Sequence, residues 1–111
     1  KNAKSLVLIL DDPDAPIGTF THWTIWNIPP QTNKIIEAVD NTFATQGINS
    51  ANQNGYIAPC PPTGTHHYIF SLYALSDNLN LPTTTTVNDL KKAIQNKIIT
   101  QTELIGLYQK S

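Results

Sequence analysis

Residues 66–75 read HHYIFSLYAL and would be apolar on both faces of a β-strand. Consecutive residues of a strand point to opposite faces, so Tyr68 and Phe70 would lie on one face and Ile69 and Tyr73 on the other. A strand with two apolar faces has to be covered on both sides. The stretch therefore predicts an interior strand of a β-sandwich or of a covered sheet, and it favours a mainly β fold.

Three further strands are predicted. Residues 5–10 (SLVLIL) are a short aliphatic run, residues 22–28 (HWTIWNI) alternate up to Pro29, and residues 102–108 (TELIGLY) alternate again. No earlier segment is present to pair with the strand over residues 5–10, so we expect partner strands that this chain does not contain.

The connecting segments are also marked in the sequence. Residues 11–21 and 45–65 are rich in Pro, Gly, Asn and Thr, which predicts loops. Residues 31–43 fit either a short strand or a turn of helix. One helix is predicted after Thr86, a suitable N-cap, with apolar residues at helical spacing as far as Ile98.

Composition limits the classes of function. The chain of 111 residues has seven Lys, no Arg and a formal net charge of -1, so a basic face for duplex nucleic acid is not expected. The single cysteine, Cys60, excludes an internal disulfide and a cysteine-rich zinc site. No apolar run approaches the ~20 residues that span a bilayer. We expect a cytoplasmic protein, with periplasmic and secreted locations left open.

Acidic residues gather after the first strand. Asp11, Asp12 and Asp14 lie within four positions and are interrupted by Pro13. Such carboxylates repel one another unless a cation, a protonated histidine or backbone N–H groups stabilise them. The alternative is a solvated Asp-Pro turn, which is the commoner meaning of this pattern alone.

Histidine and tyrosine residues gather at two predicted strand ends. His22 opens one strand beside Trp23, and His66 and Tyr68 would share one face of another while His67 takes the opposite face. An imidazole at a strand end can receive an anion, act as a general base or bind a metal. Polar tips of purely structural strands are the alternative. If the strands are neighbours, imidazole N–H and phenol O–H groups would converge on an oxyanion, with the aspartates orienting the imidazoles.

Three ordered motifs carry a resemblance to a known family. DPDAP (12–16), HWTIWNIP (22–29) and the segment 55–75, which includes PCPPTGTHHYIF, resemble the phosphatidylethanolamine-binding protein (PEBP) family, also called Raf kinase inhibitor-like proteins, in its bacterial and archaeal branch. The resemblance covers nearly the whole chain. It implies a β-sandwich of two antiparallel sheets with one or two short helices, and a pocket for phosphate or phosphorylethanolamine-like anions.

The resemblance also implies a set of ligand-binding residues, with Asp11 and His67 as accessory groups. That set is Asp12, Asp14, His22, Pro61, His66 and Tyr68. It implies no cofactor and no metal. Members of this branch usually carry several tens of residues before the strand that leads into DPDAP. We therefore expect residues 1–111 to be a single PEBP-like domain that lacks its N-terminal strands, and a separate N-terminal fragment is one partner to be considered.

Several functions compete at this point. The leading interpretation is a non-catalytic binding module for a phosphate-like group that regulates a protein partner such as a kinase or a protease. The alternative is a hydrolase that cleaves a phosphoester or ester with the Asp, His and Tyr side chains. A metal site built from Asp12, Asp14, His22 and His66 is a third and weaker interpretation.

Overall fold

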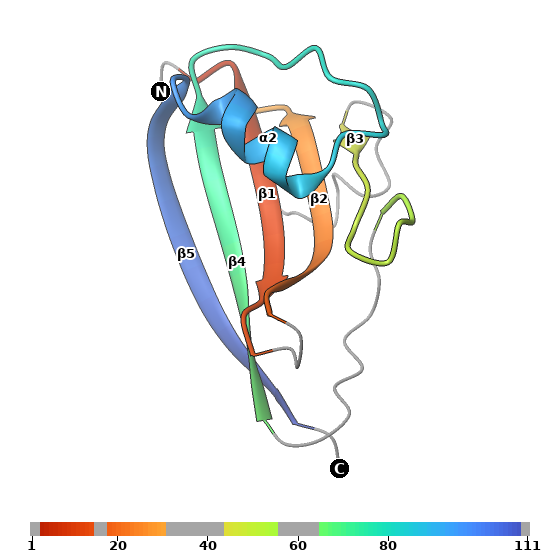
Figure 1. The fold of residues 1–111 in the computed structure, drawn as a ribbon. Coiled ribbons are helices and arrows are strands. Elements are labelled where there is room, and N and C mark those ends of the chain that lie inside the picture. The colour runs from red at the N-terminus through yellow and green to blue at the C-terminus, as the bar shows by residue number, and fades with distance from the viewer. Residues whose placement is uncertain (1–2, 15–17, 31–43, 56–64, 110–111) are drawn as a thin grey trace.

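The computed structural model describes residues 3–14, 18–30, 44–55 and 65–109. Its elements in chain order are β1 (Ser5–Asp12), β2 (Phe20–Ile28), β3 (Thr45–Gln46), β4 (Thr65–Leu75), α2 (Val87–Ile94) and β5 (Ile98–Gln109). The strands form one antiparallel sheet in the order β3-β2-β1-β4-β5 (Figure 1). The fold is mainly β, as predicted. The described residues form this one sheet and no second sheet.

Strand β1 lies at the centre of the sheet. It pairs with β2 on one side and with β4 on the other, and both partners come later in the chain. We expected the strand over residues 5–10 to need partner strands from outside this chain, and this was wrong, because later segments of the same chain supply both neighbours. Pairing also extends the strand further than its apolar run, through Asp11 and Asp12, which pair with Thr21 and Phe20. Those four residues were wrongly assigned to the loop over residues 11–21.

The sheet has two apolar faces, as the interior strand β4 predicted. Helix α2 covers one face of the sheet, here called the helix face (Figure 1). On this face, Val7, Ile9 and Trp26 of β1 and β2 pack with Leu90 and Ile94 of the helix. On the opposite face a second buried cluster contains Leu8, Leu10, Trp23, Ile25, Ile28 and Tyr68. Side chains of β1 alternate between the two clusters, which is the strand period seen in the sequence.

Helix α2 begins where the sequence predicted and ends earlier. The Thr86 side chain accepts a hydrogen bond from the Asp89 backbone N–H at 3.3 Å, which confirms the N-cap. The helix stops at Ile94, and Ile98 pairs with Leu75 as the first residue of β5. Helical spacing through Ile98 was therefore misleading, because strand pairing with β4 determines the conformation there.

Residues 44–55 are more ordered than the predicted loop. Strand β3 pairs with β2 through Thr45 and Gln46, and Ile48 forms an isolated bridge with Asn54. Gly47 lies so close to the buried Trp26 ring that a Cβ atom there would clash with the indole. Glycine at this position is thus what lets β3 approach β2. The interpretations for residues 31–43 and for Cys60 lie outside the described residues.

No helix in the described part of the chain is long and apolar enough to cross a bilayer.

Candidate functional site

A shift in strand register positions His22. Leu10 pairs with Trp23 and the next residue, Asp11, pairs with Thr21, so His22 is an extra residue on β2, as in a β-bulge. A bulge re-aims the side chain that it carries, and bulges are over-represented beside functional sites. The sequence motif marked His22 as a candidate, but the alternation of residues 22–28 gave no sign of the bulge.

His22 packs against Tyr68 across the end of β1. The two ring centroids are 5.5 Å apart, in an edge-to-face arrangement with an interplanar angle of 69°. Both residues are only 5% exposed, and they come from β2 and β4, the strands on either side of β1. The sheet therefore brings together two groups that are 46 positions apart in sequence and that were predicted to share a site.

Phe20 forms a second aromatic contact with His22, and the sequence analysis missed it. Its ring centroid lies 4.8 Å from that of the imidazole, at an interplanar angle of 61°. Phe20 pairs with Asp12 in the ladder between β1 and β2. The available signal was an aromatic residue two positions before the histidine, which places both on one face of a regular strand. Phe20 and Tyr68 thus both pack against the imidazole.

Asp12 adjoins these rings at the end of β1, where it pairs with Phe20. Its side chain accepts a hydrogen bond from the Asp14 backbone N–H at 2.8 Å, and the residue is only 4% exposed. Adjacent Asp11 is engaged elsewhere: it accepts a hydrogen bond from the Thr21 hydroxyl at 2.7 Å and lies 3.6 Å from the Lys91 ammonium group of α2. The two neighbouring carboxylates are thus stabilised by different partners, which relieves the repulsion expected from the sequence.

Asp14 binds His67 at the start of β4. One carboxylate oxygen, Oδ2, lies 2.8 Å from both the His67 backbone nitrogen and the His67 ring atom Nδ1. Both side chains are about half exposed, so the contact between them contributes little to stability, while the bond to the backbone N–H fixes the turn against β4. The expected pairing of an aspartate with an imidazole thus occurs, but with the accessory His67.

Two predicted site residues, His66 and Pro61, lie partly or wholly outside the described residues. The backbone of His66 belongs to β4 and pairs with Tyr108, whereas its side chain lies outside the described residues. Pro61 also lies outside them. In the described ranges, no three His, Cys, Asp or Glu side chains come close enough to hold a metal ion. The described cluster therefore consists of Asp12, Phe20, His22 and Tyr68, and we call it the aromatic-histidine cluster.

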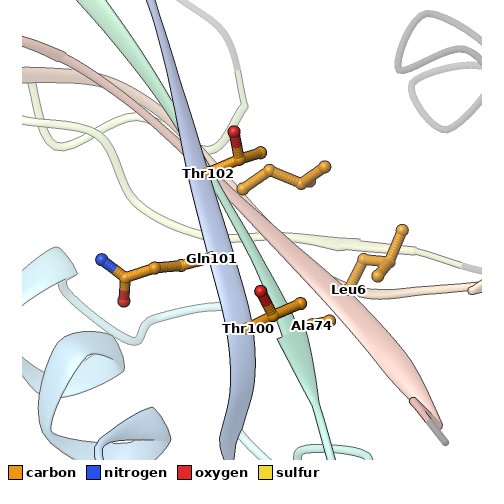
Figure 2. A pocket seen from close by; sticks show the side chains of 6 residues that line it. Leu6, Ala74, Thr100, Gln101 and Thr102 are labelled. Carbon is orange, nitrogen blue, oxygen red and sulfur yellow. The ribbon is translucent and has the colours of Figure 1, made fainter. Parts of the chain in front are cut away.

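An open hollow of about 100 Å³ lies toward the opposite end of β1 (Figure 2). It is lined by Leu6, Leu72, Ala74, Thr100, Gln101 and Thr102, which come from β1, β4 and β5. These residues carry no charge, and the lining is mainly apolar. Its lining therefore offers no charged donor for a charge-assisted bond to an anion, and the aromatic-histidine cluster is the better candidate site.

Comparison with protein families gives one match to almost the entire chain. The family model described as phosphatidylethanolamine-binding protein matches residues 1–109. Among curated relatives, a UPF0098 protein of Pyrococcus abyssi is 47% identical over 119 residues, which cover 99% of this chain and 66% of the relative. A UPF0098 protein of Pyrococcus horikoshii is 47% identical over 117 residues, covering 98% of this chain and 59% of the relative. The chain thus spans about three fifths to two thirds of these proteins.

Solved structures have the same fold. A PEBP homologue of Chlamydia trachomatis superposes with a TM-score of 0.89 at 37% sequence identity, covering all of this chain and 75% of the other. Escherichia coli YbcL, described as a member of the mammalian PEBP family, gives a TM-score of 0.85 at 26% identity and is covered to 74%. The sheet with its single described helix is therefore a known architecture, which agrees with the motifs read from the sequence.

Proposed function

Because the chain belongs to the phosphatidylethanolamine-binding protein family, we propose that its aromatic-histidine cluster binds a small anionic group, such as phosphate or the phosphorylethanolamine head group, without chemically converting it. The observation that carries this proposal is the meeting of His22 and Tyr68, both buried, over the end of β1. Each side chain has a group that can donate a hydrogen bond to an oxyanion.

Burial favours this kind of recognition. A donor in a partly desolvated site makes a stronger bond to an anion than the same donor in water, because solvent screening is reduced. Bonds to a charged acceptor are also roughly twice as strong as bonds between neutral groups. His22 and Tyr68 therefore offer strong donors at little cost in conformational entropy, because their rings are already packed.

The carboxylates have a supporting role in the proposal. A carboxylate accepts hydrogen bonds and repels an anion, so Asp12 serves by holding the turn through the Asp14 N–H. Asp14 in turn holds the start of β4 through His67. The two aspartates would then fix β1 and β4 at the site while the rings contact the ligand. His66 and Pro61 are assigned as further ligand contacts by the family motif alone.

The second part of the proposal is regulatory. Occupation of the cluster by an anion would change how this surface meets a protein partner of the kinase or protease class. Support comes only from the resemblance to Raf kinase inhibitor-like proteins. Anion binding at the cluster can be measured without any protein partner.

Calorimetric titration with phosphate, and separately with phosphorylethanolamine, tests the binding site. Tyr68→Phe removes one hydroxyl from the cluster and should weaken phosphate binding about tenfold, because one hydrogen bond to a charged group contributes about 1.5 kcal/mol or more. Tyr73→Phe is the matched control, since Tyr73 lies on the same strand but packs with the cluster on the helix face. The phosphate affinity of Tyr73→Phe should equal that of the unmodified chain.

Two outcomes would count against the proposal. The first is equal phosphate affinity for Tyr68→Phe and Tyr73→Phe, and the second is no saturable binding of either ligand. Release of phosphate from phosphorylethanolamine, lost in Tyr68→Phe and retained in Tyr73→Phe, would replace the binding module with the hydrolase alternative.

A further inference from the structure

Strand β5 forms one edge of the described sheet. It contains twelve residues, Ile98–Gln109, and within the described part of the chain it pairs only with β4. In Figure 1 it runs along the full length of the sheet on the side opposite β2 and β3. The backbone N–H and C=O groups on its outer side form a row to which another strand can be added.

This edge lacks most of the features that usually prevent pairing. Proteins protect edge strands with lysine, proline, charged side chains or short length. From Ile99 to Ile105 the strand has no proline and a single charged residue, Glu103. Ile99 is 47% exposed and Ile105 is 58% exposed, and they are the exposed large hydrophobic residues of the described chain. Both exposed isoleucines therefore belong to the edge that β5 forms in the described sheet.

The spacing of these residues is self-complementary. We propose that β5 pairs with β5 of a second copy of this chain, antiparallel and with Thr102 on the two-fold axis. In that register Ile99 lies opposite Ile105 of the second copy, and Gln101 lies opposite its Glu103. Residues directly opposite each other in an antiparallel pair have Cβ atoms about 4.5–5.5 Å apart. At that separation Ile99 and Ile105 are in contact, and the Gln101 side-chain amide donates a hydrogen bond to the Glu103 carboxylate.

Neighbouring registers are less favourable. Moving the axis to Glu103 places that carboxylate directly opposite its own copy, and like charges at this position are destabilising. Moving the axis to Gln101 places Ile99 opposite Glu103, which leaves the isoleucine without an apolar partner. The register centred on Thr102 thus pairs the exposed isoleucines with each other and keeps the glutamates apart. Shifts by a single residue would place the two α2 helices on opposite faces of the joined sheet.

We expect a weak dimer whose two-fold symmetry prevents further chains from adding through β5. A two-fold axis pairs one edge with the same edge of another copy and leaves no free β5 edge, so assembly stops at two chains. An interface made by one strand pair lies at the low end of protein interfaces, below about 1,200 Å². The dimer should therefore form and dissociate over an accessible concentration range, rather than persist at high dilution.

Sedimentation velocity over a concentration series measures this dimer. Ile105→Lys introduces a charge at both ends of the paired segment and should raise the dissociation constant at least about tenfold, because each dimer loses two cross-strand apolar contacts. Thr84→Lys adds the same charge at an exposed position away from β5 and should leave the constant unchanged. A monomer at every concentration, or a dimer that Ile105→Lys leaves unchanged, would overturn the proposal.

Disulfide trapping tests the register in a Cys60→Ser background. Thr102→Cys places two thiols on the axis with Cα atoms about 4.5–5.5 Å apart, within the range that a disulfide spans. Thr100→Cys is the matched control, because the two copies would lie four residues apart along the strand, at about 13 Å. We expect a covalent dimer from Thr102→Cys alone. Equal cross-linking of both variants, or none at residue 102, would contradict the register.

Discussion

Asp11 and Asp12 show how adjacent residues of one strand come to serve different purposes. Asp11 accepts a hydrogen bond from the Thr21 hydroxyl and lies 3.6 Å from the Lys91 ammonium group on the helix face of the sheet. Asp12 is buried at the other face and fixes the turn that leads to Asp14. The division follows from the two-residue period of a strand. A single acidic run in the sequence thus supplies a structural contact on one face and a residue of the candidate site on the other.

Asn27 is a second residue with a specialised local role. It adopts a φ of 57°, and the ladder between β1 and β2 shifts register between Leu6 and Leu8, opposite this part of β2. Its amide donates to the Leu79 carbonyl and accepts from the Leu79 N–H, each at 2.7 Å. The side chain therefore pairs with a backbone segment as another strand would. These two hydrogen bonds link β2 to the segment between β4 and α2.

Substitutions at Asn27 separate its two contributions to stability. Asn27→Gly keeps the positive φ accessible and removes both hydrogen bonds, so we expect a loss of about 2 kcal/mol in the free energy of unfolding. Asn27→Ala removes the same bonds and adds the cost of a left-handed alanine, about 1 kcal/mol more. Urea denaturation of the two variants gives the difference. Equal stability of Asn27→Gly and the unmodified chain would show that the Leu79 bonds contribute nothing net.

At the scale of elements, α2 covers the helix face through a narrow contact. Leu90 and Ile94 are its buried residues, and they pack on Val7 and Ile9 of β1. The ion pair between Lys91 and Asp11 adds little, because the lysine side chain is about half exposed and such pairs are worth less than about 1 kcal/mol. Attachment of the helix therefore depends on its apolar stripe and on a well-formed N-terminus.

The N-cap of α2 can be tested directly. Thr86→Ala removes the acceptor for the Asp89 N–H and should lower the free energy of unfolding by about 1 kcal/mol. Thr84→Ala is a matched control, because Thr84 is exposed, lies two residues earlier and lies outside the helix. Thermal unfolding followed by circular dichroism should show a lower melting temperature for Thr86→Ala only. A similar decrease in both variants would point to a general effect of the threonine run.

At the scale of the whole molecule, the sequence predicted most elements but not how they are joined. Alternation and apolar runs identified β1, β2, β4 and β5, since local patterns reflect which face of a strand is buried. The predicted element boundaries were less accurate where pairing with a distant strand determines the conformation. Ile98 has helical spacing in the sequence, but it pairs with Leu75 as part of β5. The register shift that re-aims His22 also depends on the partner strand, so a single strand's pattern could not reveal it.

The candidate site was predicted in part, and for a similar reason. The motifs named Asp12, His22 and Tyr68, and the fold brings these three to one end of the sheet. The contact between Asp14 and His67 spans 53 positions and depends on how the turn meets β4, which local sequence does not encode. Whether these residues bind an anion stays a prediction. The family assignment fixes the architecture, whereas the ligand has to be measured.

The most direct test of the anion site is a phosphate titration followed by NMR of the histidine ring resonances. The chain has three histidines, and single His→Gln variants assign their signals. We expect the His22 resonance to shift saturably with phosphate, while that of His67, which is bound to Asp14 on the surface, changes little. Tyr68→Phe should move the His22 titration to higher phosphate concentration. A His22 resonance that stays fixed at saturating phosphate, or a shift confined to His67, would contradict the proposed site.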